Sequence, residues 1–139
     1  MAASCRACWN CSISSGPGRT SCWPCSRGTS RRGAEAKLRH YDLYDRFHFG
    51  GFGDLHLERD DVAREAYDEA RRHHGNEIPG DRLWVIGDTP ADVRCGRAIG
   101  ANVIAVATGH YSTDEIAPTA PDHLFDDFGD FEVVAELIR

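Results

Sequence analysis

The sequence predicts an α/β fold: part of a doubly wound, Rossmann-like parallel sheet with flanking helices. Residues 83–88 (LWVIGD) and 102–109 (NVIAVATG) are uninterrupted apolar runs that end in polar or glycine residues. Such runs are typical of strands that are covered on both faces of a parallel sheet. A helical pattern from Pro90 to about Ile99 lies between them. Strand, helix and strand therefore follow one another, as in a βαβ unit.

Three further elements are expected before this unit. Residues 34–41 contain good helix formers and are interpreted as the end of a helix. Residues 47–54 (FHFGGFGD) are an aromatic run broken by glycines, which predicts a short buried strand followed by a tight loop. From Asp60 to His74 apolar residues recur at helical spacing, and two acidic residues lie at the positive N-terminal end. This segment predicts a helix.

The helix of the βαβ unit has a complete start signal. Thr89 is expected at the N-cap, Pro90 at the first helical position and Asp92 at the third, and a glycine follows the last turn. After the second strand, residues 123–128 (HLFDDF) predict a weak strand, and a helix is expected from about residue 131 to 138. The body of the chain is thus predicted to be the later half of a doubly wound sheet.

Charge divides the 139-residue chain, which has a net charge of −6, into two unequal parts. Residues 1–33 hold 5 basic and no acidic residues, whereas residues 34–139 hold 11 basic and 22 acidic residues. We therefore expect residues 1–33 to be an aberrant, irregular segment and residues 34–139 to be the folded body. The acidic body disfavours nucleic-acid binding. The chain has neither a secretory signal nor an apolar run long enough to cross a membrane, so a cytoplasmic protein is expected.

The predicted sheet places polar residues at its functional edge. In doubly wound sheets ligands bind beyond the carboxyl ends of the strands, where Asp88 and the loop of Thr108 and Gly109 are expected. Asp92 comes one helical turn after Asp88, so the two carboxylates can face one point, as Mg²⁺ coordination requires. The alternative is structural: Asp92 is adequately explained as a capping acid and Asp88 as a turn residue.

Two segments resemble a known family. Residues 87–109 (GDTPADVRCGRAIGANVIAVATG) resemble the fourth motif and following strand of haloacid dehalogenase (HAD) superfamily phosphohydrolases, in the branch similar to phosphoglycolate phosphatases. Residues 49–66 (FGGFGDLHLERDDVAREA) resemble the stretch that contains the third-motif basic residue. The resemblance covers nearly all of residues 34–139. It implies a HAD-type core domain, of which this chain is the C-terminal part.

The resemblance also implies a chemistry and roles for individual residues. Phosphate monoesters of a small metabolite would be hydrolysed through an aspartyl-phosphate with Mg²⁺ as cofactor. Asp88 would bind the metal, with Asp92 supporting it, and Arg59 would be the third-motif cation. Thr89, Thr108 and Gly109 would lie on the phosphate side. Without the resemblance, Arg59 is as well explained as a solvated arginine at a helix start.

The nucleophile of this chemistry has no counterpart in the written sequence. A D-x-D motif after an apolar strand is absent, and so is a second-motif Ser/Thr-Gly at the end of a strand before the third motif; the first acidic residue is Glu35. We therefore expect the chain to be an inactive fragment with exposed apolar sheet edges and poor solubility. A non-catalytic Mg²⁺- or phosphate-binding role remains an alternative. The sequence does not reveal the substrate, the cap domain or the oligomeric state.

The first segment contains five closely spaced cysteines: Cys5, Cys8, Cys11, Cys22 and Cys25. Their C-x₂-C spacings suit a zinc or iron–sulfur site, and CWPC at 22–25 resembles a thioredoxin-type redox pair. A metal-binding or redox module on an α/β scaffold is therefore an alternative function. The surrounding sequence fits neither well, because it lacks a preceding strand and apolar positions that would pack around a metal.

A reading-frame error explains the same cysteines. When each codon is read one nucleotide earlier, every Cys and Trp codon becomes Leu, Val or Met, and Trp followed by Asn forces a glutamate at position 10. The shifted frame permits an amphipathic helix, a buried strand and then Thr-Gly-Asn over positions 5–33, and it joins the written sequence without a gap. Thr-Gly-Asn is the second motif that the family requires there. A frameshift in residues 1–33 is the favoured interpretation, and the nucleophile strand would then be encoded upstream.

Overall fold

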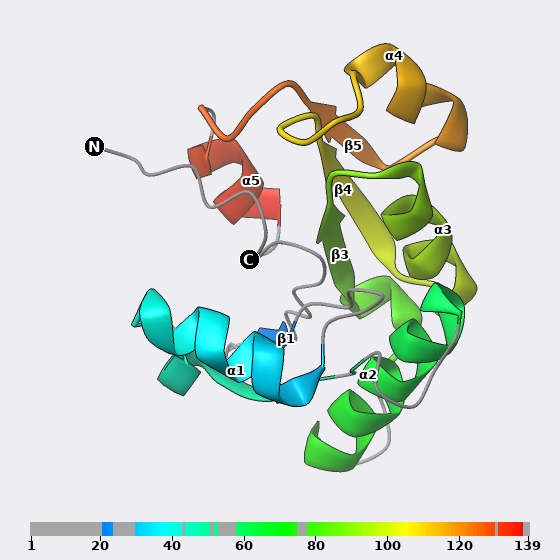
Figure 1. Cartoon of the computed structure of the whole chain (residues 1–139). Coiled ribbons are helices and arrows are strands. Elements are labelled where there is room, and N and C mark those ends of the chain that lie inside the picture. The colour runs from blue at the N-terminus through cyan, green and yellow to red at the C-terminus, as the bar shows by residue number, and fades with distance from the viewer. Residues whose placement is uncertain are drawn as a thin grey trace.

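The computed structural model describes residues 21–23, 30–42, 44–50, 52, 58–74, 78–129 and 131–137 (Figure 1). Helices and parallel strands alternate along this part of the chain. The strands are β1 (Ser21–Trp23), β2 (Phe47–Gly50), β3 (Trp84–Gly87), β4 (Asn102–Val106) and β5 (His123–Phe125). The helices are α1 (Arg31–His40), α2 (Arg59–His74), α3 (Pro90–Ala98), α4 (Thr113–Ile116) and α5 (Phe131–Leu137), with 3₁₀ turns at Tyr44–Arg46, Gly80–Arg82 and Ala117–Thr119. The α/β class expected from the sequence is confirmed.

The strands form two separate parallel sheets. The larger has the order β3–β4–β5, with Trp84 opposite Asn102 and Ile104 opposite His123. The smaller pairs β1 with β2, Ser21 lying opposite Phe47. Figure 1 shows β1 below β3, at the level where the larger sheet ends. Within the described residues, β3 and β1 each pair with a strand on one side only.

Helices cover both faces of the larger sheet, which explains the uninterrupted apolar runs of its strands. On one face α3 packs against β3 and β4, and α2 lies against α3 and beside β2 (Figure 1). On the other face Val134 of α5 packs against Ile86, Ile104 and Val106. The core beneath α2 and α3 consists of Val62, Ala63, Ala66, Ala70, Ile78, Leu83, Val85, Val93, Cys95, Ile99, Ala101, Val103, Ala105 and Ile116.

The close packing of α3 on the sheet depends on a glycine. A Cβ atom at Gly96 would lie 2.4 Å from Cγ2 of Val103 and 3.3 Å from Cβ of Val85. The helix backbone therefore approaches β3 and β4 more closely than any side chain at this position would permit. This contact fixes the height of α3 above the sheet, and with it the position of the loop from which α3 begins.

Two parts of the chain differ from the expectation. Within residues 1–33, Ser21–Trp23 form β1, and α1, whose end was expected at residues 34–41, begins at Arg31. Ser30 caps α1 by accepting a hydrogen bond from the Gly33 N–H (3.1 Å), which explains the early start. The short helix α4 was not expected, because four residues are too few to show a helical period.

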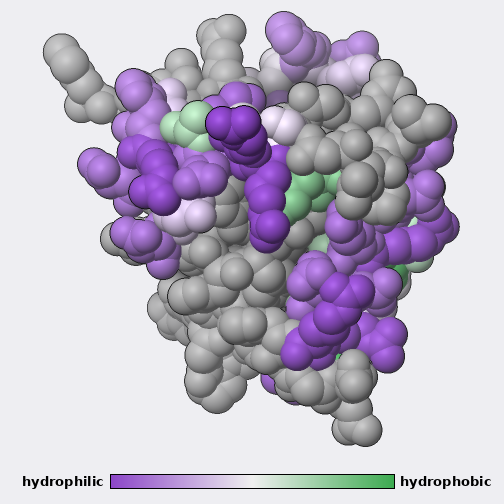
Figure 2. Space-filling view, turned by 60° about the horizontal axis from the view of Figure 1, so that its bottom comes forward, coloured by the Kyte–Doolittle hydropathy of each residue, from purple (hydrophilic) through white to green (hydrophobic). Residues whose placement is uncertain are grey.

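Charged residues make up 27% of the chain. Figure 2 shows one face on which the described residues are mostly hydrophilic, with a small apolar area among them. Among the described helices, none is both long and apolar enough to cross a membrane.

Candidate active site

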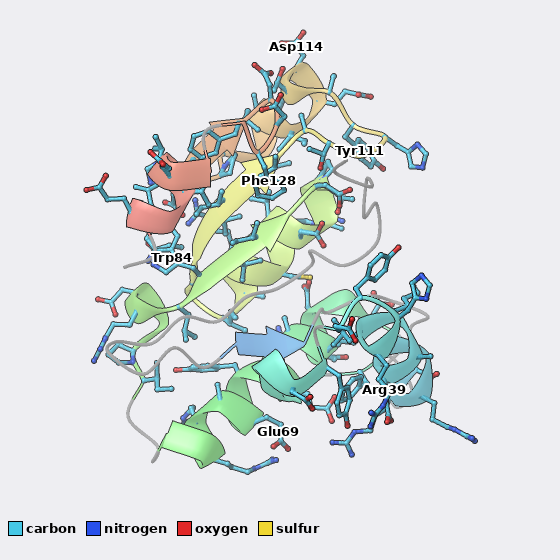
Figure 3. All side chains as sticks on the ribbon, turned by 90° about the vertical axis from the view of Figure 1, so that its left-hand side faces the viewer. Arg39, Glu69, Trp84, Tyr111, Asp114 and Phe128 are labelled. Carbon is cyan, nitrogen blue, oxygen red and sulfur yellow. The ribbon has the colours of Figure 1, made fainter. Side chains whose placement is uncertain are left out.

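Asp88 directly follows the carboxyl end of β3, where the doubly wound architecture is expected to bind ligands. Its side chain is partly buried. Figure 3 shows this edge of the sheet on the side of Tyr111, opposite to Trp84, which begins β3. A carboxylate that is only partly covered at this edge remains accessible to a cation or to a phosphate bound through one.

Asp92 lies behind Asp88 and holds the loop between β3 and α3. It is 2% exposed, and its Oδ2 accepts hydrogen bonds from the backbone N–H of Asp88 (3.2 Å) and of Thr89 (3.0 Å). The Thr89 hydroxyl donates a third hydrogen bond to the same oxygen (2.7 Å). Asp92 therefore fixes the backbone from which the Asp88 side chain extends, as an outer residue of a metal site does.

Thr89 has the role at the N-cap that the sequence predicted. Its Oγ1 accepts a hydrogen bond from the Asp92 N–H (3.2 Å), and the Asp92 carboxylate accepts one from the Thr89 N–H (3.0 Å), so the two residues form a capping box. Pro90 occupies the first helical turn, as expected. The capping function of Asp92 is thus observed, and it is compatible with support of a metal ligand at Asp88.

Gly87 was not recognised as a site residue from the sequence. A Cβ atom at this position would lie 2.3 Å from Cβ of Asp92 and 2.7 Å from its Oδ2. Only glycine lets Asp92 approach the end of β3 closely enough to reach the N–H groups beyond it. The available signal was a glycine between an apolar run and an acidic residue, which indicates a close backbone approach.

The loop after β4 brings Gly109 next to Asp88, although 21 positions separate them in the sequence. A Cβ atom at Gly109 would lie 2.2 Å from Oδ2 of Asp88. Thr108 and Gly109 are both exposed, and Thr108 N–H donates a hydrogen bond to the carbonyl of Val106 (2.8 Å). The structure therefore joins the two loops that the sequence placed at the same edge.

The far end of the loop after β4 is held by a second capping box. The backbone N–H and the hydroxyl of Ser112 donate hydrogen bonds to Oε2 of Glu115 (2.9 and 3.0 Å). The hydrogen bond from the Ser112 N–H, followed by that from its hydroxyl, lowers the pKa of Glu115. Glu115 is therefore ionised at neutral pH and keeps the loop fixed at this end.

Arg59 is the first residue of α2, and its side chain lies outside what the structure describes. Its neighbour Asp60 lies near α3, because the Cys95 thiol is 3.6 Å from Oδ1 of Asp60. The N-terminal end of α2 is therefore beside the helix that begins immediately after Asp88. The assignment of Arg59 as the basic residue of the site stays a prediction.

The cysteine set of the first segment falls almost entirely outside the described residues. Cys22 alone of the five belongs to a described element, β1, and its side chain is not described. Among the described side chains, Cys95 is a buried cysteine whose thiol lies 3.6 Å from Oδ1 of Asp60. The metal-site and redox interpretations of the first segment stay predictions.

The donor set at Asp88 fits Mg²⁺. This ion is held in proteins by one or two carboxylates, while waters and phosphate oxygens complete its octahedron. Over the described part of the chain, no three His, Cys, Asp or Glu side chains gather as a dedicated metal cage. Asp88 at an open strand end, with Asp92 bonded to the backbone behind it, offers an accessible carboxylate oxygen, which is the kind of ligand that Mg²⁺ accepts.

Solved structures share this fold. A protein of Clostridium difficile described as a phosphatase is 21% identical with a TM-score of 0.70 over 88% of this chain and 54% of its own. A haloacid dehalogenase-like hydrolase of Streptococcus pneumoniae is 20% identical with a TM-score of 0.60 over 76% of this chain and 47% of its own. A protein described as a phosphoglycolate phosphatase of Haemophilus somnus is 20% identical with a TM-score of 0.59, over 73% and 44%.

The chain thus spans about half the length of the structures that it matches. No curated protein sequence matches it. The model of the HAD-hydrolase-like family matches residues 62–131, just over half of the 139 residues and the segment that contains β3, α3, β4 and Asp88. The chain therefore belongs to the HAD-hydrolase-like family.

Proposed function

We propose that this chain supplies the magnesium-binding part of a cytoplasmic phosphohydrolase that cleaves phosphate monoesters of a small metabolite. The observation that carries the proposal is the position of Asp88 at the carboxyl end of β3, with the Asp92 carboxylate bonded to the backbone N–H of Asp88 behind it. Membership of the HAD-hydrolase-like family supports the reaction class, and the acidic chain and polar surface favour neither nucleic acid nor membrane as a partner.

In this proposal each residue has a distinct task. Asp88 holds Mg²⁺, which neutralises phosphate charge when it is bound. Asp92 holds the backbone of Asp88 in place. Thr89, Thr108 and Gly109 line the phosphate side, and Arg59 at the start of α2 balances the charge of the phosphate and nucleophile.

The nucleophile must come from outside the written sequence. The reaction needs an aspartate that attacks phosphorus, forms an aspartyl-phosphate and expels the alcohol, and a second acid that protonates this leaving group. Water then releases inorganic phosphate and restores the aspartate. The one-sided pairing of β3 and β1 among the described residues supports a further parallel strand between the two sheets, which would bring such an aspartate to the edge of Asp88.

Magnesium titration of the 139-residue chain, followed by calorimetry, tests the metal part of the proposal. We expect saturable binding that Asp88→Asn abolishes. Asp81→Asn is the matched control, because Asp81 is exposed and precedes the amino end of β3, at the opposite edge of the sheet. Binding that survives Asp88→Asn, or that is lost equally in Asp81→Asn, would refute the assignment.

A non-catalytic role is the second candidate, because the written sequence contains no D-x-D motif. In that case the chain binds Mg²⁺ or phosphate through the same edge and regulates or sequesters its ligand. An assay of a longer protein, expressed with the upstream coding sequence, distinguishes the two proposed functions. Mg²⁺-dependent release of phosphate from an aryl phosphate, lost in Asp88→Asn, supports the hydrolase, and binding without turnover supports the second candidate.

A further inference from the structure

We propose that Gly109 is a positioning residue, which sets the orientation of the Asp88 carboxylate by presenting bare backbone to it. The inference rests on the proposed role of Asp88 as the ligand of Mg²⁺. It assigns to Gly109 a task different from contact with phosphate: the glycine determines where the metal-binding oxygen of another loop lies.

The backbone of Gly109 lies very close to the Asp88 side chain. A Cβ atom at Gly109 would lie 2.2 Å from Oδ2, 3.0 Å from Cγ and 3.4 Å from Cβ of Asp88. The carboxylate therefore occupies the space that a side chain at position 109 would fill. Among the described glycines a positive φ occurs at Gly100 (70°), not at Gly109. Glycine is required at position 109 for space and not for backbone conformation.

The backbone on each side of this contact is held in place. Ala107 N–H donates a hydrogen bond to the carbonyl of Phe125 (2.8 Å), and the Ser112–Glu115 capping box fixes the other end of the loop. On the opposite side, Asp92 holds the backbone N–H of Asp88. When a methyl group is added at Gly109, the part that can move is the flexible end of the Asp88 side chain.

This mobility predicts the consequence of a substitution. In Gly109→Ala the Asp88 side chain turns about χ1 to another staggered rotamer, because its Cγ as well as its Oδ2 lies too close to the added methyl group, and the fold is retained. The oxygen then points away from its former position, so Mg²⁺ binding weakens. The outer residues of metal sites typically contribute about 10-fold to 100-fold to metal affinity, and a loss of about tenfold or more is expected here.

Two measurements on the full 139-residue chain test the inference. The first is NMR of the metal-free chain, in which three-bond couplings to Cγ of Asp88 report its χ1 rotamer. Gly109→Ala should change the Asp88 rotamer, whereas His110→Ala, an exposed substitution in the same loop, should leave it unchanged. The second is a titration with Mg²⁺ alone, in which Gly109→Ala should bind about tenfold or more weakly than the unsubstituted chain, and His110→Ala equally well.

The outcomes distinguish this inference from the proposed function. An unchanged Asp88 rotamer in Gly109→Ala overturns the inference, and so does unfolding of the variant, because the side chain is expected to absorb the contact. A changed rotamer with unchanged Mg²⁺ affinity overturns the role toward the metal. If the unsubstituted chain binds no Mg²⁺ but the rotamer changes, the proposed function fails while the positioning of Asp88 by Gly109 is supported.

Discussion

Thr89 and Asp92 exchange hydrogen bonds across the first turn of α3. The Asp92 N–H donates to Oγ1 of Thr89 (3.2 Å), while the N–H and hydroxyl of Thr89 donate to Oδ2 of Asp92 (3.0 and 2.7 Å). The same Oδ2 atom also accepts a hydrogen bond from the Asp88 N–H (3.2 Å). One buried carboxylate thus caps a helix and fixes the backbone of the candidate metal ligand.

Loss of this carboxylate should destabilise the fold. In Asp92→Ala the N–H groups of Asp88 and Thr89 lose their shared acceptor near the buried end of β3, and the capping box is broken. We expect the free energy of unfolding to fall by about 2–3 kcal/mol. Urea unfolding followed by circular dichroism measures the change. Asp114→Ala, an exposed acid in α4, is the control and should change stability by less than about 0.5 kcal/mol. Equal effects of the two substitutions would contradict the prediction.

Addition of a side chain at Gly96 should also destabilise the fold, because α3 packs closely on the sheet there. A methyl group there would lie 2.4 Å from Cγ2 of Val103, a β-branched side chain in the core, so α3 must move away from the sheet. The better helix propensity of alanine offsets part of the cost, and we expect Gly96→Ala to lose about 1–2 kcal/mol of unfolding free energy. Thermal unfolding beside Arg94→Ala, an exposed substitution in the same helix, checks this, and a Gly96→Ala protein as stable as the control would refute it.

Local sequence patterns were sufficient to predict most of the larger sheet. β3, α3 and β4 were predicted because two apolar runs and a capping signal at Thr89 lie within 27 residues of sequence. β1 was not expected from the residues Ser21–Trp23 as written, because three residues are too few to show a strand pattern; it pairs with β2, which is distant in the sequence.

The candidate site could be predicted in its residues but not in its contacts. Asp88 and Asp92 follow from their spacing after a strand. The approach of Gly109 to Asp88 joins two loops that are separated by a whole helix and strand, so local periodicity carries no information on it. The close packing of Gly87 against Asp92 was missed for another reason, since a glycine at the end of a strand is equally typical of an ordinary turn.

Asp122 gives the stability of the protein a defined dependence on pH. Partial burial by itself would raise the pKa of Asp122, but hydrogen bonds from the Val103 N–H (2.7 Å) and Arg97 (2.9 Å), with the charge of Arg97, lower it overall. A lowered folded-state pKa contributes stability that is complete above the unfolded pKa of about 3.9 and is lost as the pH falls through the folded value.

Replacement of Asp122 by Asn should reduce this acid sensitivity. The Arg97 and Asp122 side chains are 44% and 34% exposed, so solvent screening limits the contribution to less than about 1 kcal/mol. Urea unfolding at pH 6 and at pH 3 should show a smaller loss on acidification for Asp122→Asn than for the unsubstituted chain. Asp114→Asn serves as the matched control and should lose as much as the unsubstituted chain. A loss in Asp122→Asn equal to that of the control would contradict the assigned pKa direction.

The 139-residue chain alone should show no measurable phosphatase turnover, because the D-x-D aspartate that attacks phosphorus in the proposed reaction is absent from its sequence. Resequencing of the coding DNA from upstream of Met1 through the codon for Glu35 is the decisive companion measurement. We expect a single missing or extra base, with an upstream D-x-D strand in frame with Thr-Gly-Asn. The protein expressed from the corrected frame should then release phosphate from an aryl phosphate in a Mg²⁺-dependent reaction that Asp88→Asn abolishes. Turnover by the 139-residue chain itself would refute the need for an added nucleophile.

An intact written frame would refute the frameshift. The cysteines from Cys5 to Cys25 would then be tested for stoichiometric zinc, with Cys22→Ser and Cys25→Ser as the variants that should lose it.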